Sequence, residues 1–354
     1  MYPGTKRYPR SVAVHLRFKR HLRFLRDGAV VRVVRDLQDD ATLPAGEAFD
    51  HVFAALEQAP EEQALREDLS RRLNSGTQLI DGLLARLFDL GLLERFDPAD
   101  RTFENLDRQL HLFDALDPLT DHAENIARQQ RLSNAHVLIL GLGGIGHQVA
   151  LSLAAAGVGT LIVVDGDQVE ASNLHRQILF GANDVGRRKV DAARDGIRRV
   201  APACDVVTRD TLVGSPDEWW RLIATFPDVR HVMLSADKPV QLVNWLSDTR
   251  KEFRYHFIKC GYMTTQGLIG PLLGPDTKGY DELLSSWGGL IDSQPANIHA
   301  FNARSIAPTM AASNAIMANI AAMELIKHIT GAGTLTLLEQ RLLLHLTTYH
   351  TQFG

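Results

Sequence analysis

Between residues 135 and 235, short apolar runs alternate with longer amphipathic stretches. Four apolar runs predict strands, at 137–140, 160–164, 205–208 and 231–235. Two stretches with helical spacing predict helices among them, at 146–156 and 189–200. Alternation of this kind is typical of a parallel sheet with right-handed crossovers. We therefore predict an α/β fold with a Rossmann-like, mostly parallel sheet.

The first hundred residues follow a different pattern. Apolar positions alternate on either side of Asp27-Gly28, which predicts a small β-hairpin. From Phe49 to Phe96 the apolar residues recur at helical spacing, and Gly91 stands where the last helix would end. A hairpin with three short helices resembles a winged-helix fold. We predict two domains, 1–100 and 101–354, with the boundary in a polar stretch.

Composition narrows the setting of the chain. The 354 residues are 45% hydrophobic and carry a formal net charge of -4. The two cysteines, Cys204 and Cys260, are too few for a disulfide framework or a four-thiolate zinc site. We expect a reducing, cytoplasmic compartment. The start of the chain lacks the apolar region of a signal peptide, and no apolar stretch is long enough to cross a membrane.

A glycine-rich segment follows the first predicted strand of the sheet. The run from Val137 ends in a Gly-x-Gly-Gly-x-Gly turn, made by Gly141, Gly143, Gly144 and Gly146. Such a turn before a helix presents backbone N–H groups to a phosphate, although a tight turn without a ligand gives the same pattern. Asp165 ends the next strand, where a carboxylate either accepts hydrogen bonds from ribose or caps a helix.

Further polar residues extend this pattern toward a triphosphate. Asn173, Arg176, Gln177 and Lys189 follow the second strand, and separated cations suit the α-, β- and γ-phosphates. Taken singly, such an arginine or lysine is as typical of a solvated surface. Asp237 ends another predicted strand, where a carboxylate can hold Mg²⁺ beside phosphate oxygens.

These residues belong to blocks that occur together in one family. The chain carries Gly-x-Gly-Gly-x-Gly, Asp-x-Asp, Ser-Asn-Leu-x-Arg-Gln, Val-Gly-x-x-Lys and Ser-Ala-Asp in this order. Their order and spacing resemble the ThiF, MoeB and ubiquitin-activating adenylyltransferases. Segments similar to the branch that adenylates peptide-antibiotic precursors, such as the microcin C and pantocin A enzymes, lie at 232–245, 258–262, 270–272 and 306–308. The resemblance covers about residues 103–346.

The resemblance implies a homodimeric, Mg-ATP-dependent enzyme that adenylates a carboxylate. It places ATP on the four glycines, the ribose near Asp165 and Asp167, and Mg²⁺ on Asp237. It places the phosphates on Asn173, Arg176, Gln177 and Lys189. In related dimers an arginine upstream of the glycine loop enters the partner's site. Arg108 holds that position here, and a surface arginine beside Asp107 is the alternative interpretation.

The chain also departs from the family pattern. Where relatives carry paired zinc-binding cysteines, residues 278–282 read Lys-Gly-Tyr-Asp-Glu, so the resemblance implies no zinc. Cys260 falls in a predicted buried strand and is a poor candidate for the acyl-accepting thiol of some relatives. We therefore expect the adenylate to be consumed directly, by a group of the substrate or by a second substrate.

The N-terminal domain suggests which substrate is activated. A winged-helix module ahead of this catalytic domain resembles the leader-recognition element of enzymes that modify ribosomally made peptides. Residues 24–34 would offer a sheet edge to a precursor peptide. Ten Lys or Arg against one acid between residues 6 and 35 would steer an acidic leader. DNA binding and a solvated basic face are the alternatives; we expect neither a nucleic-acid nor a membrane partner.

Other functions remain open at this stage. Relatives adenylate the C-terminus of a ubiquitin-like sulfur carrier or a tRNA-borne carboxylate, and a degenerate ATP-binding scaffold is a non-enzymatic alternative. Residues 274–303 would form either a lid over the activated carboxylate or a surface loop.

Overall fold

The computed structural model describes residues 14–35, 38–283 and 308–354. Three of the ten counted cations, Lys6, Arg7 and Arg10, lie outside this range, as does most of the predicted lid, 284–303. The chain divides into two compact units, Met1–Gln130 and Arg131–Gly354. Each unit is described by itself.

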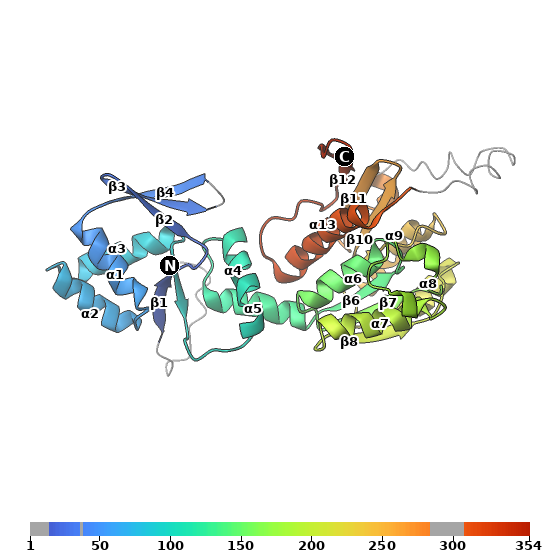
Figure 1. The fold of residues 1–354 in the computed structure, drawn as a ribbon, viewed down its shortest axis with the longest axis horizontal. Helices are drawn as coiled ribbons and strands as arrows, with labels where there is room; N and C mark the ends of the chain where they lie inside the picture. The colour runs from blue at the N-terminus through green and yellow to red at the C-terminus, as the bar shows by residue number, and fades with distance from the viewer. Residues whose placement is uncertain (1–13, 36–37, 284–307) are drawn as a thin grey trace. The chain divides into compact units, whose positions relative to one another are not determined.

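The N-terminal unit combines two small sheets with helices (Figure 1). Its strands are β1 (His15–Phe18), β2 (Arg23–Asp27), β3 (Val30–Arg35), β4 (Gln38–Pro44) and β5 (Leu93–Phe96). Its α-helices are α1 (Glu47–Glu57), α2 (Glu62–Arg72), α3 (Thr77–Asp89), α4 (Asp107–Leu116) and α5 (His122–Ser133). Strands β2, β3 and β4 form one antiparallel sheet in that order, and β1 pairs with β5.

The structure contains the predicted hairpin and the three short helices. Gly28 adopts φ of 57° in the turn between β2 and β3, a conformation that favours glycine. Gly91, at φ of 64°, follows α3 as predicted. We did not predict β5, because Glu94 and Arg95 interrupt its apolar pattern. Glu94 is nevertheless buried, with its Oε1 2.6 Å from Arg17 Nε on β1.

Ion pairs offset five of the seven cations that the structure describes between residues 14 and 35. Lys19 Nζ lies 2.9 Å from Asp114 Oδ1, and both side chains are buried. Arg17, Arg20, Arg26 and Arg32 form ion pairs with Glu94, Asp107, Asp50 and Asp27, and the last three of these pairs are exposed. A charge count along the chain does not reveal these acidic partners, because most of them belong to helices and strands that are distant in the sequence. The expected steering of an acidic leader by a basic field therefore loses its main support.

The C-terminal unit is built on one eight-stranded sheet, in the order β13-β12-β11-β10-β9-β6-β7-β8. Its strands are β6 (His136–Leu140), β7 (Thr160–Val164), β8 (Asp205–Arg209), β9 (His231–Leu234), β10 (His256–Met263), β11 (Gln266–Leu273), β12 (Leu342–His345) and β13 (Thr351–Phe353). The five strands from β10 to β8 are mutually parallel. Strands β11, β12 and β13 continue the sheet in antiparallel pairs.

Helices cover both faces of this sheet (Figure 1). The helices are α6 (Gly146–Ala155), α7 (Lys189–Val200), α8 (Pro216–Ala224), α9 (Leu242–Phe253), α10 (Tyr280–Leu283) and α13 (Ala311–Thr330). Helices α6, α7 and α13 share one apolar core with Val137 and Ile139 of β6. Helices α8 and α9 share the other core with Leu138 and Leu140. The alternation along β6 is that of a strand buried on both faces.

The predicted α/β fold with a mostly parallel sheet is confirmed. Predicted strands and helices of the parallel half agree with the structure to within one residue at each end. The compact units divide within α5, between residues 130 and 131, whereas we predicted a boundary near residue 100. The winged-helix comparison and the domain assignment stay predictions. Among the described residues, no helix has both the length and the apolar character needed to cross a membrane.

Candidate nucleotide site

The glycine loop closes tightly at the carboxyl end of β6. Gly141 adopts φ of 94°, and a Cβ there would lie 2.8 Å from the backbone N of Ala236. A Cβ on Gly146 would lie 1.9 Å from the carbonyl O of Gly141 and 2.3 Å from Ser235 Oγ. These two glycines are therefore required for β6, β9 and the start of α6 to approach one another.

The middle of the loop is more open. A Cβ on Gly143 would meet no atom within 4 Å. A Cβ on Gly144 would lie 2.2 Å from Asn314 Nδ2, at the start of α13. The loop leads directly into α6, whose first backbone N–H groups and positive dipole end favour an anion. This arrangement fits a phosphate that contacts the backbone at Gly143.

Asp165 already supports the loop through its carboxylate. Asp165 Oδ2 accepts a hydrogen bond of 2.6 Å from Leu142 N, inside the loop. Asp165 Oδ1 accepts one of 2.9 Å from Asp167 N. The side chain is buried, and its carboxylate oxygens have lone pairs for further donors. Asp165 thus holds the loop in place, a role that sequence reasoning did not assign to it.

Lys189 lies beside the same carboxylate. Its Nζ is 2.8 Å from Asp167 Oδ2 and 3.9 Å from Asp165 Oδ1. Lys189 is the first residue of α7 and is buried, whereas the Asp167 side chain is 57% exposed. The structure therefore brings the glycine loop, both aspartates and this lysine together at one edge of the sheet.

The predicted phosphate contacts Asn173, Arg176 and Gln177 lie on the segment between β7 and α7. Asn173 ends the 3-10 helix η2 (Ala171–Asn173), and its Oδ1 accepts a hydrogen bond from Glu170 N. Arg176 NH1 donates to the carbonyl O of Ser172 at 2.7 Å. Gln177 is buried with Oε1 unpaired. Within the described residues, none of the three is hydrogen-bonded to the glycine loop.

Asp237 lies at the carboxyl end of β9, next to the loop. The preceding residue, Ala236, donates its N–H to the carbonyl O of Leu140 and packs against Gly141. The Asp237 side chain is exposed and makes no hydrogen bond or ion pair with the part of the chain that the structure describes. A carboxylate at this position with unused oxygens has the donor chemistry that Mg²⁺ prefers.

Arg108 belongs to the N-terminal unit. It lies on α4 with an exposed side chain. Its neighbour Gln109 is tied to Gln129 Oε1 by a hydrogen bond of 2.6 Å. The role of Arg108 in a partner's site stays a prediction.

Both cysteines are buried, and this burial was predicted for Cys260. Cys260 lies in β10 and is 3% exposed, and burial raises the pKa of its thiol. Burial also raises the pKa of Cys204, to about 11. Neither environment favours the thiolate that a nucleophile needs.

The stretch at 278–282 has polar contacts in place of paired thiols. Tyr280 is buried, and its hydroxyl accepts a hydrogen bond of 2.9 Å from Arg341 NH2. Gly279 N donates to Glu282 Oε1 at 2.8 Å. That the chain binds no zinc stays a prediction.

Three polar residues around the loop were not predicted. Ser235 Oγ donates to the carbonyl O of Gly141 at 2.7 Å. His147 is buried, and its Nδ1 lies 2.7 Å from the carbonyl O of Gly143. Asn314 comes from α13, far away in the sequence. Its position in an alanine-rich helix carries no sign of a site, whereas Ser235 begins the Ser-Ala-Asp block and His147 directly follows Gly146.

Comparisons with known proteins place this site in a family. A model described as the ThiF family matches residues 106–353. The probable adenylyltransferase/sulfurtransferase MoeZ of Mycobacterium tuberculosis is 54% identical over 74 residues, 21% of this chain and 19% of that protein. The adenylyltransferase and sulfurtransferase uba4 of Emericella nidulans is 55% identical over 74 residues, 21% of this chain and 15% of that protein. These matches thus span about a fifth of the relatives' length or less.

Solved structures resemble the chain over nearly its whole length. A crystal structure of E. coli MccB with ATP has a TM-score of 0.77 at 21% identity, covering 96% of both chains. A crystal structure of PaaA has a TM-score of 0.73 at 26% identity, covering 95% of this chain and 98% of that one. The fold is therefore shared with both, and the predicted ThiF/MoeB-type resemblance is confirmed. Because the family model matches more than half of the chain, the chain belongs to the ThiF family.

Proposed function

We propose that this chain is a Mg-ATP-dependent adenylyltransferase that activates a carboxylate on a ribosomally made precursor peptide. The activated peptide would then be modified or cyclised during the biosynthesis of a peptide antibiotic. The observation that carries the proposal is a cluster of residues at one edge of the sheet. There Asp165 joins Lys189 to the glycine loop, and the carboxylate of Asp237, which has no partner among the described residues, lies next to the loop.

The residues at this edge divide the work of binding ATP. The loop at Gly143 and the start of α6 receive phosphate oxygens, while Lys189 supplies a positive charge held in place by Asp167. Asp165 and Asp167 face the ribose, and Asn173, Arg176 and Gln177 reach the phosphates from their segment. Asp237 would hold Mg²⁺, which would supply positive charge against the phosphates.

The reaction is an in-line displacement at the α-phosphate. A carboxylate oxygen of the peptide attacks phosphorus, pyrophosphate leaves, and a mixed anhydride with AMP forms. Positioning and charge stabilisation account for the catalysis. Since both cysteines are buried, we propose that no enzyme thiol intercepts this anhydride.

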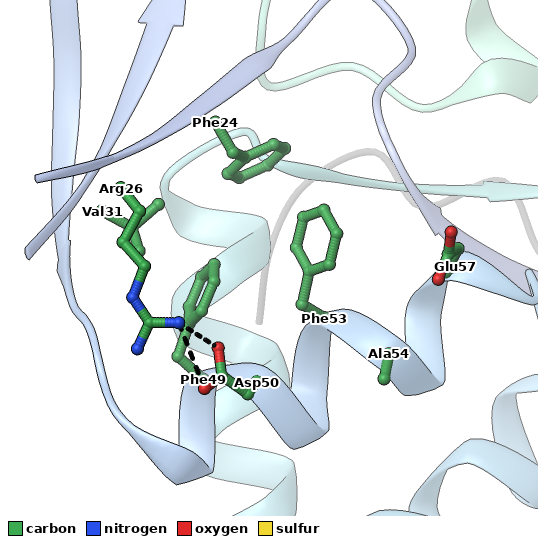
Figure 2. A pocket seen from close by; sticks show the side chains of 8 residues that line it. All are labelled: Phe24, Arg26, Val31, Phe49, Asp50, Phe53, Ala54 and Glu57. Carbon is green, nitrogen blue, oxygen red and sulfur yellow. Dashed lines mark hydrogen bonds and ion pairs between the residues drawn. The ribbon is translucent and has the colours of Figure 1, made fainter.

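The N-terminal unit supplies a place for the peptide. Strand β2 pairs with β3 on one side, and the structure shows no described strand on its other side. Beside it lies a hollow of about 240 Å³ between β2 and α1, shown in Figure 2. Phe24 of β2 faces Phe49 and Phe53 of α1 across this hollow, and Arg26 is paired with Asp50 at one end.

An extended leader peptide fits these features. Main-chain hydrogen bonds to the edge of β2 would provide affinity, and an apolar side chain inserted among the phenylalanines would provide selectivity. Because most of the described cations nearby already have acidic partners, we propose apolar rather than acidic selection. E. coli MccB, whose fold this chain shares, has been crystallised with its peptide MccA, which supports a peptide partner.

The C-terminus of a ubiquitin-like sulfur carrier is the second candidate substrate. The 74-residue match to MoeZ and to uba4, both named adenylyltransferase and sulfurtransferase, favours it. No observation favours a tRNA-borne carboxylate. We further propose that the enzyme is a homodimer in which Arg108 enters the partner's site. We also propose that it is cytoplasmic.

Exchange of labelled pyrophosphate into ATP tests the proposed function. We expect exchange that requires Mg²⁺ and a ribosomally made precursor peptide. Exchange with a sulfur carrier protein in place of the peptide would favour the second candidate. If neither the peptide nor the sulfur carrier protein supported exchange, the proposed adenylation would be contradicted.

A further inference from the structure

Asn314 presents an unused hydrogen-bond donor to the glycine loop. The residue is 1% exposed, and its Nδ2 lies against Gly144. Its Oδ1 accepts a hydrogen bond of 2.8 Å from the Thr309 hydroxyl, which fixes which way the amide faces. Nδ2 has no hydrogen-bond partner within the described parts of the chain. A buried donor left without an acceptor costs free energy, so an acceptor is expected when the site is occupied.

Asn314 also belongs to a second helix that begins at this edge. Helix α13 begins at Ala311 and packs beside α6, which begins at Gly146. Ser152 Oγ of α6 donates to Asn319 Oδ1 of α13 at 2.7 Å, which sets the two helices in register. The first backbone N–H groups of α13 lack acceptors within the helix, and its dipole makes this end positive. Two positive helix ends therefore flank the loop.

The proposed reaction brings two anions to this edge. The triphosphate takes the loop, the start of α6 and Lys189. The second anion is the carboxylate that attacks the α-phosphate, and it needs a place next to the loop. The donors that α13 offers there are neutral. Neutral donors hold a carboxylate without the strong ion pair that would reduce its nucleophilicity.

We propose that Asn314 Nδ2 and the first turn of α13 form the subsite for the substrate's carboxyl group. This inference rests on the proposed adenylation. One carboxylate oxygen attacks the α-phosphorus, the bond from that phosphorus to the bridging oxygen breaks, and pyrophosphate leaves with the electron pair. Asn314 donates to the other carboxylate oxygen, which becomes the carbonyl oxygen of the acyl adenylate.

Two nucleotide probes test the subsite without knowledge of the peptide. AMP occupies the nucleotide site alone, whereas N-acetylsulfamoyl adenosine adds an acyl carbonyl where the carboxyl group would lie. Calorimetry gives the ratio of their dissociation constants for the wild type and for Asn314→Ala and Asn314→Asp. The aspartate variant has the same shape and keeps an acceptor for Thr309. Ile316→Ala, a 39% exposed position on the same helix, is the matched control.

We expect the wild type to prefer the acyl probe. Asn314→Ala should reduce that preference about tenfold, the scale of one lost hydrogen bond to a buried donor, while AMP affinity stays within about twofold. Asn314→Asp should reduce it further, because its carboxylate repels the acyl oxygen. Ile316→Ala should preserve it.

Two results would overturn the inference, and they are distinguishable. An unchanged preference in both Asn314 variants, with normal AMP binding, would remove the subsite and leave the proposed adenylation standing. A wild-type protein that binds neither probe would remove the proposed adenylation together with the subsite. Unchanged AMP affinity in the variants would show that they fold.

Discussion

The four glycines of the loop have different structural roles. Gly141 and Gly146 allow β6, β9 and α6 to approach one another, whereas Gly143 leaves open space beside its Cα. The motif alone does not distinguish these roles, because the residue is glycine at all four positions. The distances to a hypothetical Cβ do separate them, and they give a paired prediction.

Gly143→Ala should leave the fold intact and weaken ATP binding. Its φ lies outside the left-handed region and its Cβ meets no protein atom, so stability should change by less than about 0.5 kcal/mol. The added methyl group would lie where a phosphate contacts the backbone, and we expect at least a tenfold loss in ATP affinity by calorimetry. Gly146→Ala, with its Cβ 1.9 Å from a carbonyl oxygen, should instead destabilise the C-terminal unit. Equal ATP affinity in Gly143→Ala and the wild type would refute the phosphate assignment.

Asp237→Ala should abolish adenylation without affecting the fold. The side chain is exposed and has no described partner, so its removal should change stability by less than about 0.5 kcal/mol. Loss of the proposed Mg²⁺ ligand should reduce pyrophosphate exchange at least 100-fold. Asp228→Ala, an exposed residue near the opposite end of β9, serves as the control. Wild-type exchange in Asp237→Ala would exclude the metal role.

At the scale of elements, the amino ends of β9 and β10 meet the last turn of α13 in a cluster of histidines. The ring of His328 lies 4.1 Å from that of His256 and 5.2 Å from that of His231, measured between ring centroids. Burial lowers the pKa of His231 to about 3 and that of His328 to about 4. Burial also lowers the pKa of His256, although Asp276 opposes the shift. Arg230 adds to the lowering at His231.

This cluster predicts that the C-terminal unit loses stability in acid. The unfolded chain binds protons at these histidines as the pH falls below about 6.5, whereas the folded chain resists them until about pH 4 and below. The free energy of unfolding should therefore decrease through that window, by about 1.4 kcal/mol for each unit of pKa shift. All four tryptophans lie in this unit, so their fluorescence in urea at pH 7 and pH 5 reports it.

His328→Gln should flatten this pH dependence, because it removes one of the titrating groups. His175→Gln, at an exposed position of the same unit, should leave it unchanged. Identical urea curves for His328→Gln and the wild type at both pH values would rule out the cluster as the cause.

The hollow between β2 and α1 predicts an effect of mutation on peptide binding. Phe53→Ala should weaken binding of the precursor peptide at least tenfold, because the ring contacts both Phe24 and Phe49 in the hollow. ATP affinity should not change. Leu79→Ala, a 63% exposed residue of α3 in the same unit, is the control. A peptide that binds Phe53→Ala and the wild type equally well must have its site elsewhere.

At the scale of the whole molecule, the sequence predicts local periodicity better than long-range pairing. The parallel strands and their helices were predictable because each is a continuous apolar or amphipathic run. Strand β5 was not, because the buried Glu94 in it is paired with Arg17, which is 77 residues away. The compact N-terminal unit likewise extends to residue 130, since the buried pair of Lys19 with Asp114 ties β1 and its following turn to α4.

The candidate site shows the same division. Its motifs could be found from the sequence because they recur at fixed spacing after strands. Asn314 could not, because its role depends on how α13 packs against α6. The charge count in the first 35 residues misled for a related reason, since acids from α1 and α4 cancel much of it.

The same ion pairs change how the N-terminal unit should be tested. Deleting residues 1–95 would remove the hollow between β2 and α1. We therefore expect a far larger loss of peptide affinity than of ATP affinity. The deletion would also leave Asp114 without Lys19. Phe53→Ala is therefore the cleaner experiment.

The transfer of one oxygen atom tests the central claim most directly. The precursor peptide is prepared with oxygen-18 in its carboxyl groups, incubated with the enzyme, Mg²⁺ and ATP, and the products are analysed by mass spectrometry. Attack of the carboxylate on the α-phosphate, followed by consumption of the anhydride, predicts one heavy oxygen in AMP and none in pyrophosphate. Heavy oxygen in inorganic phosphate, with ADP as the nucleotide product, or AMP without label would contradict the account.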